Sequence, residues 1–205
     1  MTLFSEAEQQ RIADAISSSE AHTSGEIVAV VAHTSDDYFY IPLLWAAIVA
    51  LLVPWILIFQ TWLPAWQIYA IQLATFLVVA LLARFDAIRL ALVPKGVKHA
   101  RGHRNAVEQF LAQGMHTTKG RTGVLIFVSV AERFAEVIAD DRIYELVPKS
   151  TWQNIVDRLI GQISAGKPVE GFVSAIEASG QLLAQHFPPG SEDPDELPNH
   201  LIVLD

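Results

Sequence analysis

The sequence predicts an α/β domain, a small mixed sheet with helices on both faces, and a two-helix transmembrane hairpin inserted after the first strand. No charged residue lies between Asp37 and Arg84, a stretch rich in Leu, Ile, Val and Ala. The β-branched runs EIVAVVA and TGVLIFVSV flank that stretch at a distance and are typical of strands buried on both faces. Helical patterns precede and follow these runs, which predicts helices packed against a sheet.

The segment before the apolar stretch predicts one helix and one strand. Ser5 and Glu8 have the S-x-x-E spacing of a capping box, so a helix should begin there and run to about Ala21. Residues 26–32 (EIVAVVA) then predict the first strand. Because one helix and one strand are not stable alone, they must pair with chain that follows the apolar stretch.

The apolar stretch predicts a membrane hairpin within residues 38–94. Residues 41–59 and 68–83 form two apolar runs without a charged residue, and a helix of about 20 residues crosses the hydrocarbon core of a bilayer. The short link between the runs is uncharged and contains Trp62 and Trp66. Indole rings favour the membrane–water interface, so we expect both to lie there.

The flanking charges predict the orientation of the hairpin. Arg84, Arg89, Lys95 and Lys98 follow the second run, whereas the link between the runs has no Lys or Arg. The positive-inside rule places this basic flank in the cytoplasm, next to the membrane surface. Two crossings return the chain to the side it left, so we expect a cell (inner) membrane protein with both termini cytoplasmic. Residues 1–25 are polar, and we expect no secretory signal peptide.

The chain beyond the hairpin supplies the rest of the domain. The pattern predicts a helix from Lys98 to Gln113 with Val107, Phe110 and Leu111 facing inward. Strands are expected at residues 122–130 and 134–139, joined as an antiparallel hairpin. Further helices are expected from Asp141, from a second capping box formed by Ser150 and Gln153, and from Pro168 to about His186.

These elements divide the chain into three parts. Residues 1–37 and 95–187 form one discontinuous α/β domain, and residues 38–94 form the hairpin with its basic flank. Residues 188–205 form an acidic, Pro-rich tail, in which Asp193, Asp195 and Glu196 are a solvated linker or a cation site. The tail ends in a short apolar run that could dock on the sheet.

Composition excludes several classes of function. The chain has no cysteine, which excludes disulfides, thiolate metal sites and cysteine nucleophiles. Its net charge of −8 gives no basic face for nucleic acid. The expected partners are the lipid bilayer, a membrane protein and a second copy of the chain in a homo-oligomer.

Carboxylates near strand ends are the candidate metal ligands. Asp140 and Asp141 follow the second strand of the predicted hairpin, and Glu26 opens the first strand. Carboxylate oxygens suit a divalent cation such as Ca²⁺ or Mg²⁺. Alternatively, one aspartate caps the next helix while the other is solvated, and Glu26 pairs with Arg121.

Charged residues in two turns are candidate partner- or anion-binding groups. Glu132 and Arg133 lie at the tip of the strand hairpin and either contact a partner or form an exposed turn. Lys119 and Arg121 belong to HTTKGR, which could grip an anion but lacks P-loop spacing. The histidines of H-A-R-G-H at residues 99–103 would share a helix face, which we expect to meet lipid headgroups.

Several stretches together resemble the TPM-domain family. They are SGEIVAVVA, then NAVEQFLAQGMHTTKGRTGVLIFVSVAERFAEVIAD, then a helical end with Gly166 and Gly171. The family includes a thylakoid-lumen protein, a photosystem II repair protein and an acetylcholine-receptor modulator. The resemblance covers residues 3–33 and about 101–187, and it points to a bacterial branch that carries the inserted hairpin.

The resemblance implies an α/β/α sandwich and a role in assembly, repair or modulation of a membrane complex. Some members are described as acid phosphatases or as binders of divalent metal, which makes a metal-dependent acid phosphatase the alternative function. The family usually has a glycine-rich turn after the second hairpin strand. Here that turn is DDRIYELVPKST, without glycine, so we expect an accessory role rather than catalysis.

Overall fold

The computed structural model describes residues 3–189, 197 and 199–204. The chain divides into two compact units. One contains residues up to Ser35 together with those from His99 onward, and the other is Asp36–Lys98. Asp193, Asp195 and Glu196 of the tail lie outside the described residues, and so does the expectation for their carboxylates.

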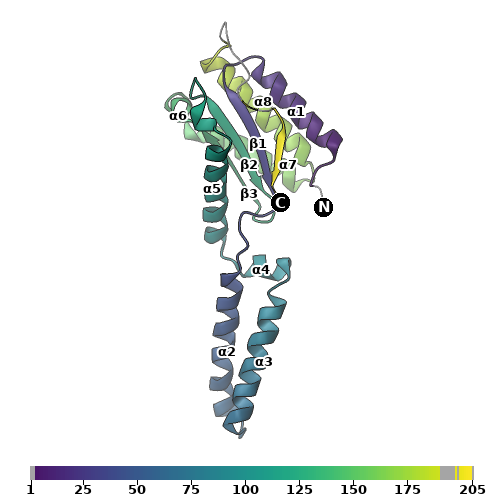
Figure 1. The fold of residues 1–205 in the computed structure, drawn as a ribbon, viewed down its shortest axis with the longest axis vertical. Helices are drawn as coiled ribbons and strands as arrows, with labels where there is room; N and C mark the ends of the chain where they lie inside the picture. Colours follow the sequence, from purple (N-terminus) through teal and green to yellow (C-terminus); the bar gives the residue numbers. More distant parts are fainter. Residues whose placement is uncertain (1–2, 190–196, 198, 205) are drawn as a thin grey trace. The chain divides into compact units, whose positions relative to one another are not determined.

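The first unit is built on a four-stranded mixed sheet (Figure 1). Its strands are β1 (Glu26–Ala32), β2 (Gly123–Ser129), β3 (Phe134–Ala139) and β4 (Leu201–Leu204), in the spatial order β3-β2-β1-β4. β1 pairs in parallel with β2 and β4, and β2 pairs antiparallel with β3. The predicted mixed sheet is confirmed, and β3 and β4 are its edge strands.

Helices cover both faces of this sheet. Side chains from α1 (Glu6–Glu20), α7 (Lys149–Ser164) and α8 (Pro168–His186) pack on one face, in a cluster with alternate residues of β1 such as Ile27 and Val31. α5 (Lys95–Ala112) packs on the other face through Ala106 and Phe110, against Val28 and Val30. Every residue of β1 and β2 is buried, which explains why neither strand shows polar alternation in the sequence.

Local signals define several helix ends. Ser5 caps α1: its hydroxyl accepts from the N–H of Glu8, and the Glu8 carboxylate accepts from the N–H of Ser5, as a capping box requires. α8 begins with Pro168 at its first turn. Gly114 and Gly166, which follow α5 and α7, both have positive φ, the conformation that ends helices most readily at glycine.

Two details of the predicted helices are wrong. The buried side of α5 consists of Gly102, Ala106 and Phe110, whereas Val107 is 36% and Leu111 is 52% exposed. Ser150 does not cap α7, because the helix already starts at Lys149 after Pro148. Gln153, the expected partner of Ser150 in the box, instead donates to Asp157. The short helix expected from Asp141 is α6 (Asp141–Leu146), and η1 (Met115–Thr117) precedes β2.

The second unit consists of α2 (Tyr40–Gln60), α3 (Ala65–Leu82) and α4 (Asp86–Leu92). Among the described residues, α2 and α3 are the helices long and apolar enough to cross a membrane, with a mean hydropathy of 2.5 for α2 and 1.8 for α3. Pro54 lies inside α2. Large apolar side chains are exposed along both helices, including Trp55 at 69% and Phe59 at 75%. Two helices therefore occupy the place after β1 where the sequence predicts the hairpin.

Candidate functional site

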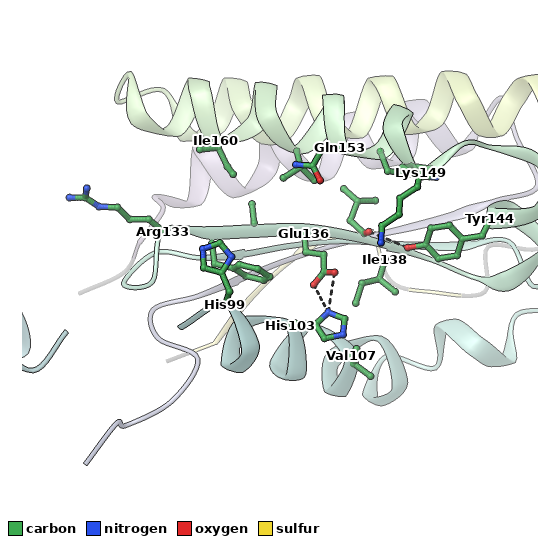
Figure 2. Close-up of a pocket in the computed structure, with 15 residues that line it drawn as sticks. His99, His103, Val107, Arg133, Glu136, Ile138, Tyr144, Lys149, Gln153 and Ile160 are labelled. Atoms are coloured by element: carbon green, nitrogen blue, oxygen red, sulfur yellow. Dashed lines mark hydrogen bonds and ion pairs between the residues drawn. The ribbon is translucent and has the colours of Figure 1, made fainter. Parts of the chain in front are cut away.

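A groove runs along β3 in the α/β unit, and we call it the edge groove (Figure 2). Its floor is the stretch from Phe134 to Ile138, and its volume is about 640 Å³. α5 forms one wall and α7 the other, while Tyr144 of α6 and Arg133 of the β2–β3 turn also line it. The wall residues are His99, His103 and Val107 on α5, and Lys149, Trp152, Gln153, Val156 and Ile160 on α7.

Among the described strands, β3 has a neighbour, β2, on only one side, and its other side opens into the edge groove. Asp140 donates its N–H to Gly123 of β2, so even-numbered residues of this stretch direct their backbone groups toward β2. Backbone groups of successive strand residues alternate in direction, so Ala135, Val137 and Ala139 direct theirs into the groove. Tyr144 confirms this direction, because its hydroxyl accepts from Ala139 N at 3.3 Å and donates to Val137 O at 3.4 Å.

Tyr144 therefore takes the place of a strand partner at one end of β3. Burial raises the pKa of its phenol above the ordinary 10.0, and the charge of Glu136 acts in the same direction. The hydrogen bond from Ala139 N opposes that shift. The phenol thus stays protonated at neutral pH and can donate to Val137 O.

The α5 wall carries an imidazole–carboxylate pair that sequence reasoning missed. His103 Nδ1 lies 2.8 Å from Glu136 Oε2 on β3, as the dashed lines in Figure 2 show. His99, one turn earlier, packs edge-on against Phe134 with ring centroids 5.5 Å apart. Both histidines thus contact the sheet of their own unit while remaining exposed, and that they meet lipid headgroups stays an expectation. The i, i+4 spacing was the available signal, but it could not show which surface the shared face meets.

The candidate metal ligands lie at the end of the sheet where β1 and β2 begin. Asp140 is 3% exposed. Its carboxylate accepts hydrogen bonds from Arg121 Nε at 3.2 Å and from the N–H of Asp141 at 2.6 Å. Asp141 is exposed, 3.6 Å from Arg121. Asp140 is thus the N-cap of α6. The hydrogen bond and charge of Asp140 raise the pKa of Arg121.

Glu26 is 8% exposed at the start of β1. The ion pairs of Arg121 go to Asp140 and Asp141, not to Glu26 as the pairing alternative expects. In the part of the chain that the structure describes, no group of three or more His, Asp or Glu side chains could hold a metal ion. Lys119 is exposed in the same turn as Arg121, whose guanidinium is already engaged by carboxylates.

The tip of the strand hairpin is less open than expected. Glu132 is 6% exposed, so the prediction that this pair forms an exposed turn is wrong for Glu132. Its carboxylate accepts from Thr34 Oγ1 at 3.1 Å, from Ser35 N at 2.9 Å and from Ser129 Oγ. These bonds tie the segment after β1 to the β2–β3 turn. Arg133 is exposed with a φ of 53° and lines the edge groove.

The candidate membrane-interface residues all belong to the second unit. Trp62 is fully exposed between α2 and α3, and Trp66 is 69% exposed in the first turn of α3. Arg89 pairs with Asp86 at 2.7 Å within α4. The other basic residues of this set also follow α3 in the sequence. Arg84 and Lys95 are exposed, and Lys98 is half-buried.

Comparisons with known proteins support the resemblance to the TPM-domain family. Residues 87–182 match the family model described as the TPM domain, a span from α4 to near the end of α8. The match confirms the predicted resemblance over residues 87–182, whereas residues 3–33 lie outside the matched span. Among curated proteins, none matches this sequence.

A solved structure shares the fold. The NMR structure of BA42 protein from the psychrophilic bacteria Bizionia argentinensis sp. nov. superposes with a TM-score of 0.62 at 22% sequence identity. The match covers 98% of this chain and 95% of that chain. The chain therefore shares this fold, resembles the TPM domain over residues 87–182, and has two long apolar helices after β1.

Proposed function

We propose that this protein is a membrane-anchored accessory protein whose α/β unit lies at the cytoplasmic face of the cell membrane and assists assembly, repair or modulation of a membrane complex. The observation that carries the proposal is the pair of apolar helices α2 and α3, inserted between β1 and α5. Their large exposed side chains need an apolar surrounding, and a bilayer supplies it.

The place of the insertion supports an anchor. The chain leaves the α/β unit after β1 and returns to it through α5, and β1 then pairs with β2 in one sheet. A unit assembled from chain on both sides of the hairpin requires both segments on one side of the bilayer. Two crossings satisfy this requirement, whereas one crossing would separate β1 from β2.

The distribution of charge supports the cytoplasmic side. Arg84, Arg89, Lys95 and Lys98 follow α3, and α5 continues with further arginines. The link of residues 61–64 has no charge. Basic residues near membrane helices remain in the cytoplasm, so the link should face the opposite side.

The edge groove supports an accessory role. It offers a strand edge, apolar walls and a few charged groups, which suit the binding of a protein segment. The ion pair with the exposed Arg121 gives a structural reason for the buried charge of Asp140 without requiring chemistry.

Topology can be tested directly because the chain has no cysteine. Single cysteines would replace Gln10 in α1, Trp62 in the link and Lys167 before α8, each an exposed position. In intact cells a membrane-impermeant maleimide should label only Trp62→Cys, and after lysis all three variants should react. Labelling of Gln10→Cys and Lys167→Cys on opposite sides would contradict the proposal.

The accessory role is tested by purification at native expression in mild detergent. A membrane-protein complex should co-purify in constant proportion, and recovery of the chain alone would contradict the role. The phosphatase alternative is tested on the same preparation, by measuring phosphate release at acid pH with and without chelator. A chelator-sensitive activity lost in an Asp140→Ala, Asp141→Ala double variant would favour that alternative.

A further inference from the structure

We infer that the edge groove binds an extended, acidic segment of a partner protein, which adds to the sheet as a strand beside β3. This inference rests on the proposed accessory function and names the surface through which it would act. The groove, the direction of the β3 backbone and the charges on the walls each bear on it.

The backbone of β3 supplies the hydrogen-bonding edge. Ala135 and Val137 direct their N–H groups away from β2, and within the described part of the chain these N–H groups have no hydrogen-bond partner. Val137 O and Ala139 N meet the Tyr144 hydroxyl. Strand addition is therefore open from Ala135 to the N–H of Val137, and the Tyr144 hydroxyl closes the edge beyond that point. A bound segment would satisfy donors that the fold leaves open.

The depth of the edge favours a single extended segment over a second copy of the chain. Ala135 is 8% and Val137 is 5% exposed, because α5 and α7 rise on either side of β3. In a symmetric dimer paired through β3, each edge strand would lie at the bottom of its own groove. Two recessed strands cannot approach to the roughly 4.8 Å that strand pairing needs, whereas a free segment can enter.

The walls define the side chains that such a segment should carry. A strand directs alternate side chains to opposite sides, here toward α5 and toward α7. Val107 on α5 and Ile160 on α7 are 36% and 37% exposed, so the walls offer apolar contacts to small aliphatic side chains.

The charges of the groove favour acidic side chains. Arg133 and Lys149 lie at its lining, and Figure 2 shows their side chains extending from the β2–β3 turn and from α7. The carboxylate of Glu136, which also faces the groove, is engaged by His103. Lys149 therefore presents a cationic group to the groove and Arg133 adds a positive charge beside it, in a protein whose net charge is −8. A segment alternating acidic and aliphatic residues matches both features.

The test measures binding of synthetic peptides to the full chain in detergent micelles. The probe is a fluorescent peptide of about seven residues that alternates valine and glutamate. One comparison peptide has lysine in place of glutamate, and another has the same side chains with N-methyl groups on alternate amides. We expect the probe to bind, and both comparison peptides to bind at least about fivefold more weakly. Equal binding of the acidic and lysine peptides, or binding of neither, would overturn the inference.

Two variants locate the binding. Ala135→Pro removes an N–H that points away from β2, a position where an edge strand tolerates proline. Lys149→Glu reverses a wall charge at the start of α7, where a carboxylate also favours the helix dipole. Each variant should bind the probe peptide about fivefold more weakly than wild type, or more weakly still. Arg158→Glu makes the same charge change on α7 outside the groove, and it should leave binding unchanged.

The remaining outcomes separate this inference from the proposed function. Probe binding that both groove variants leave intact would overturn the inference. Absence of probe binding, together with dimers that Ala135→Pro disrupts, would assign the edge to a second copy and also overturn it. Co-purification of a membrane complex that survives Ala135→Pro and Lys149→Glu would overturn the groove as its contact while the accessory function stands. Probe binding without any co-purifying complex would support the groove and contradict the function.

Discussion

Leu52 in α2 and Leu146 in α6 have nearly the same exposure, 53% and 51%, yet they differ in meaning. Leu52 lies among exposed apolar neighbours such as Leu51 and Ile56 on a helix of hydropathy 2.5. Leu146 ends a short helix that begins Asp-Arg and contains Glu145. An isolated exposed leucine is ordinary on a soluble surface, whereas a continuous apolar surface needs a partner phase. The comparison shows that the surrounding surface, rather than the exposure of one side chain, separates the two units.

Replacing each of these two leucines with lysine should therefore have very different effects on the protein, and this is the largest difference that we predict. Leu52→Lys places a charge near the middle of α2, and we expect it to disfavour membrane insertion by about 2.5–3.5 kcal/mol. Leu146→Lys should change the unfolding free energy by no more than about 0.5 kcal/mol. Insertion is measured by carbonate extraction of membranes, and unfolding by urea titration in detergent. Equal effects at both sites would remove the distinction between the units.

Within the α/β unit, Glu132 should be the most sensitive of the turn residues. Glu132→Ala leaves Thr34, Ser35 N and Ser129 without their shared acceptor. Ser129 is fully buried, and a donor buried without its acceptor costs free energy, so we expect a loss of about 1–3 kcal/mol in urea unfolding. The neighbouring control Arg133→Ala alters an exposed side chain and should cost less than about 0.5 kcal/mol. A small effect at Glu132 would show that water replaces its role.

Two helical glycines give opposite predictions. A Cβ on Gly102 of α5 would lie 2.5 Å from Phe134 Cδ1, so Gly102→Ala should destabilise the unit by about 1–3 kcal/mol through overpacking. A Cβ on Gly161 of α7 would meet nothing within 4 Å. Gly161→Ala should therefore stabilise by about 0.5–1 kcal/mol through helix propensity. Urea midpoints that move in the same direction would contradict the close contact between α5 and β3.

The capping box of α1 should give a small effect that depends on pH. Hydrogen bonds from the Ser5 backbone and side chain lower the pKa of Glu8 below its ordinary 4.5. The resulting stability is present above pH 4.5 and is lost as pH falls through the lowered pKa. Ser5→Ala should cost about 1 kcal/mol at neutral pH. The difference in unfolding free energy between Ser5→Ala and wild type, measured by urea titration, should become smaller below pH 4.5. A difference that stays constant with pH would contradict the hydrogen bonding between Ser5 and Glu8.

Where the signal was local, the sequence predicted the structure closely. The bounds of β1 and β3 match the expected strands, and the capping box at Ser5 forms as its spacing indicates. The β-branched runs are buried on both faces, so each strand can be recognised as a continuous apolar run without knowing which face each side chain points to. Ser150 and Gln153 had the same local spacing, yet Pro148 starts α7 earlier. A short polar motif is therefore reliable only when no stronger helix start precedes it.

Where the structure depends on distant chain, the sequence was a poorer guide. The buried face of α5 is formed by Gly102, Ala106 and Phe110. Glycine and alanine carry little hydropathy, so the larger Val107 and Leu111 dominated the pattern although they face outward. His103 meets Glu136 across 33 positions of sequence, and Glu132 meets Thr34 across 98. No local pattern encodes either contact.

The sequence by itself indicated most of the helices and strands, although not α4 or η1, and it located the uncharged hairpin between them, because hydrophobic periodicity and charge are properties of consecutive residues. Only the tertiary structure decided that β3 lies at an edge, that β4 joins the far side of β1 in parallel, and that α5 and α7 rise on either side of β3 to form a groove. These arrangements depend on how buried surfaces and backbone hydrogen bonds are shared among elements far apart in the chain. The candidate site is therefore a product of packing, although most of its residues belong to helices and strands that the sequence predicts.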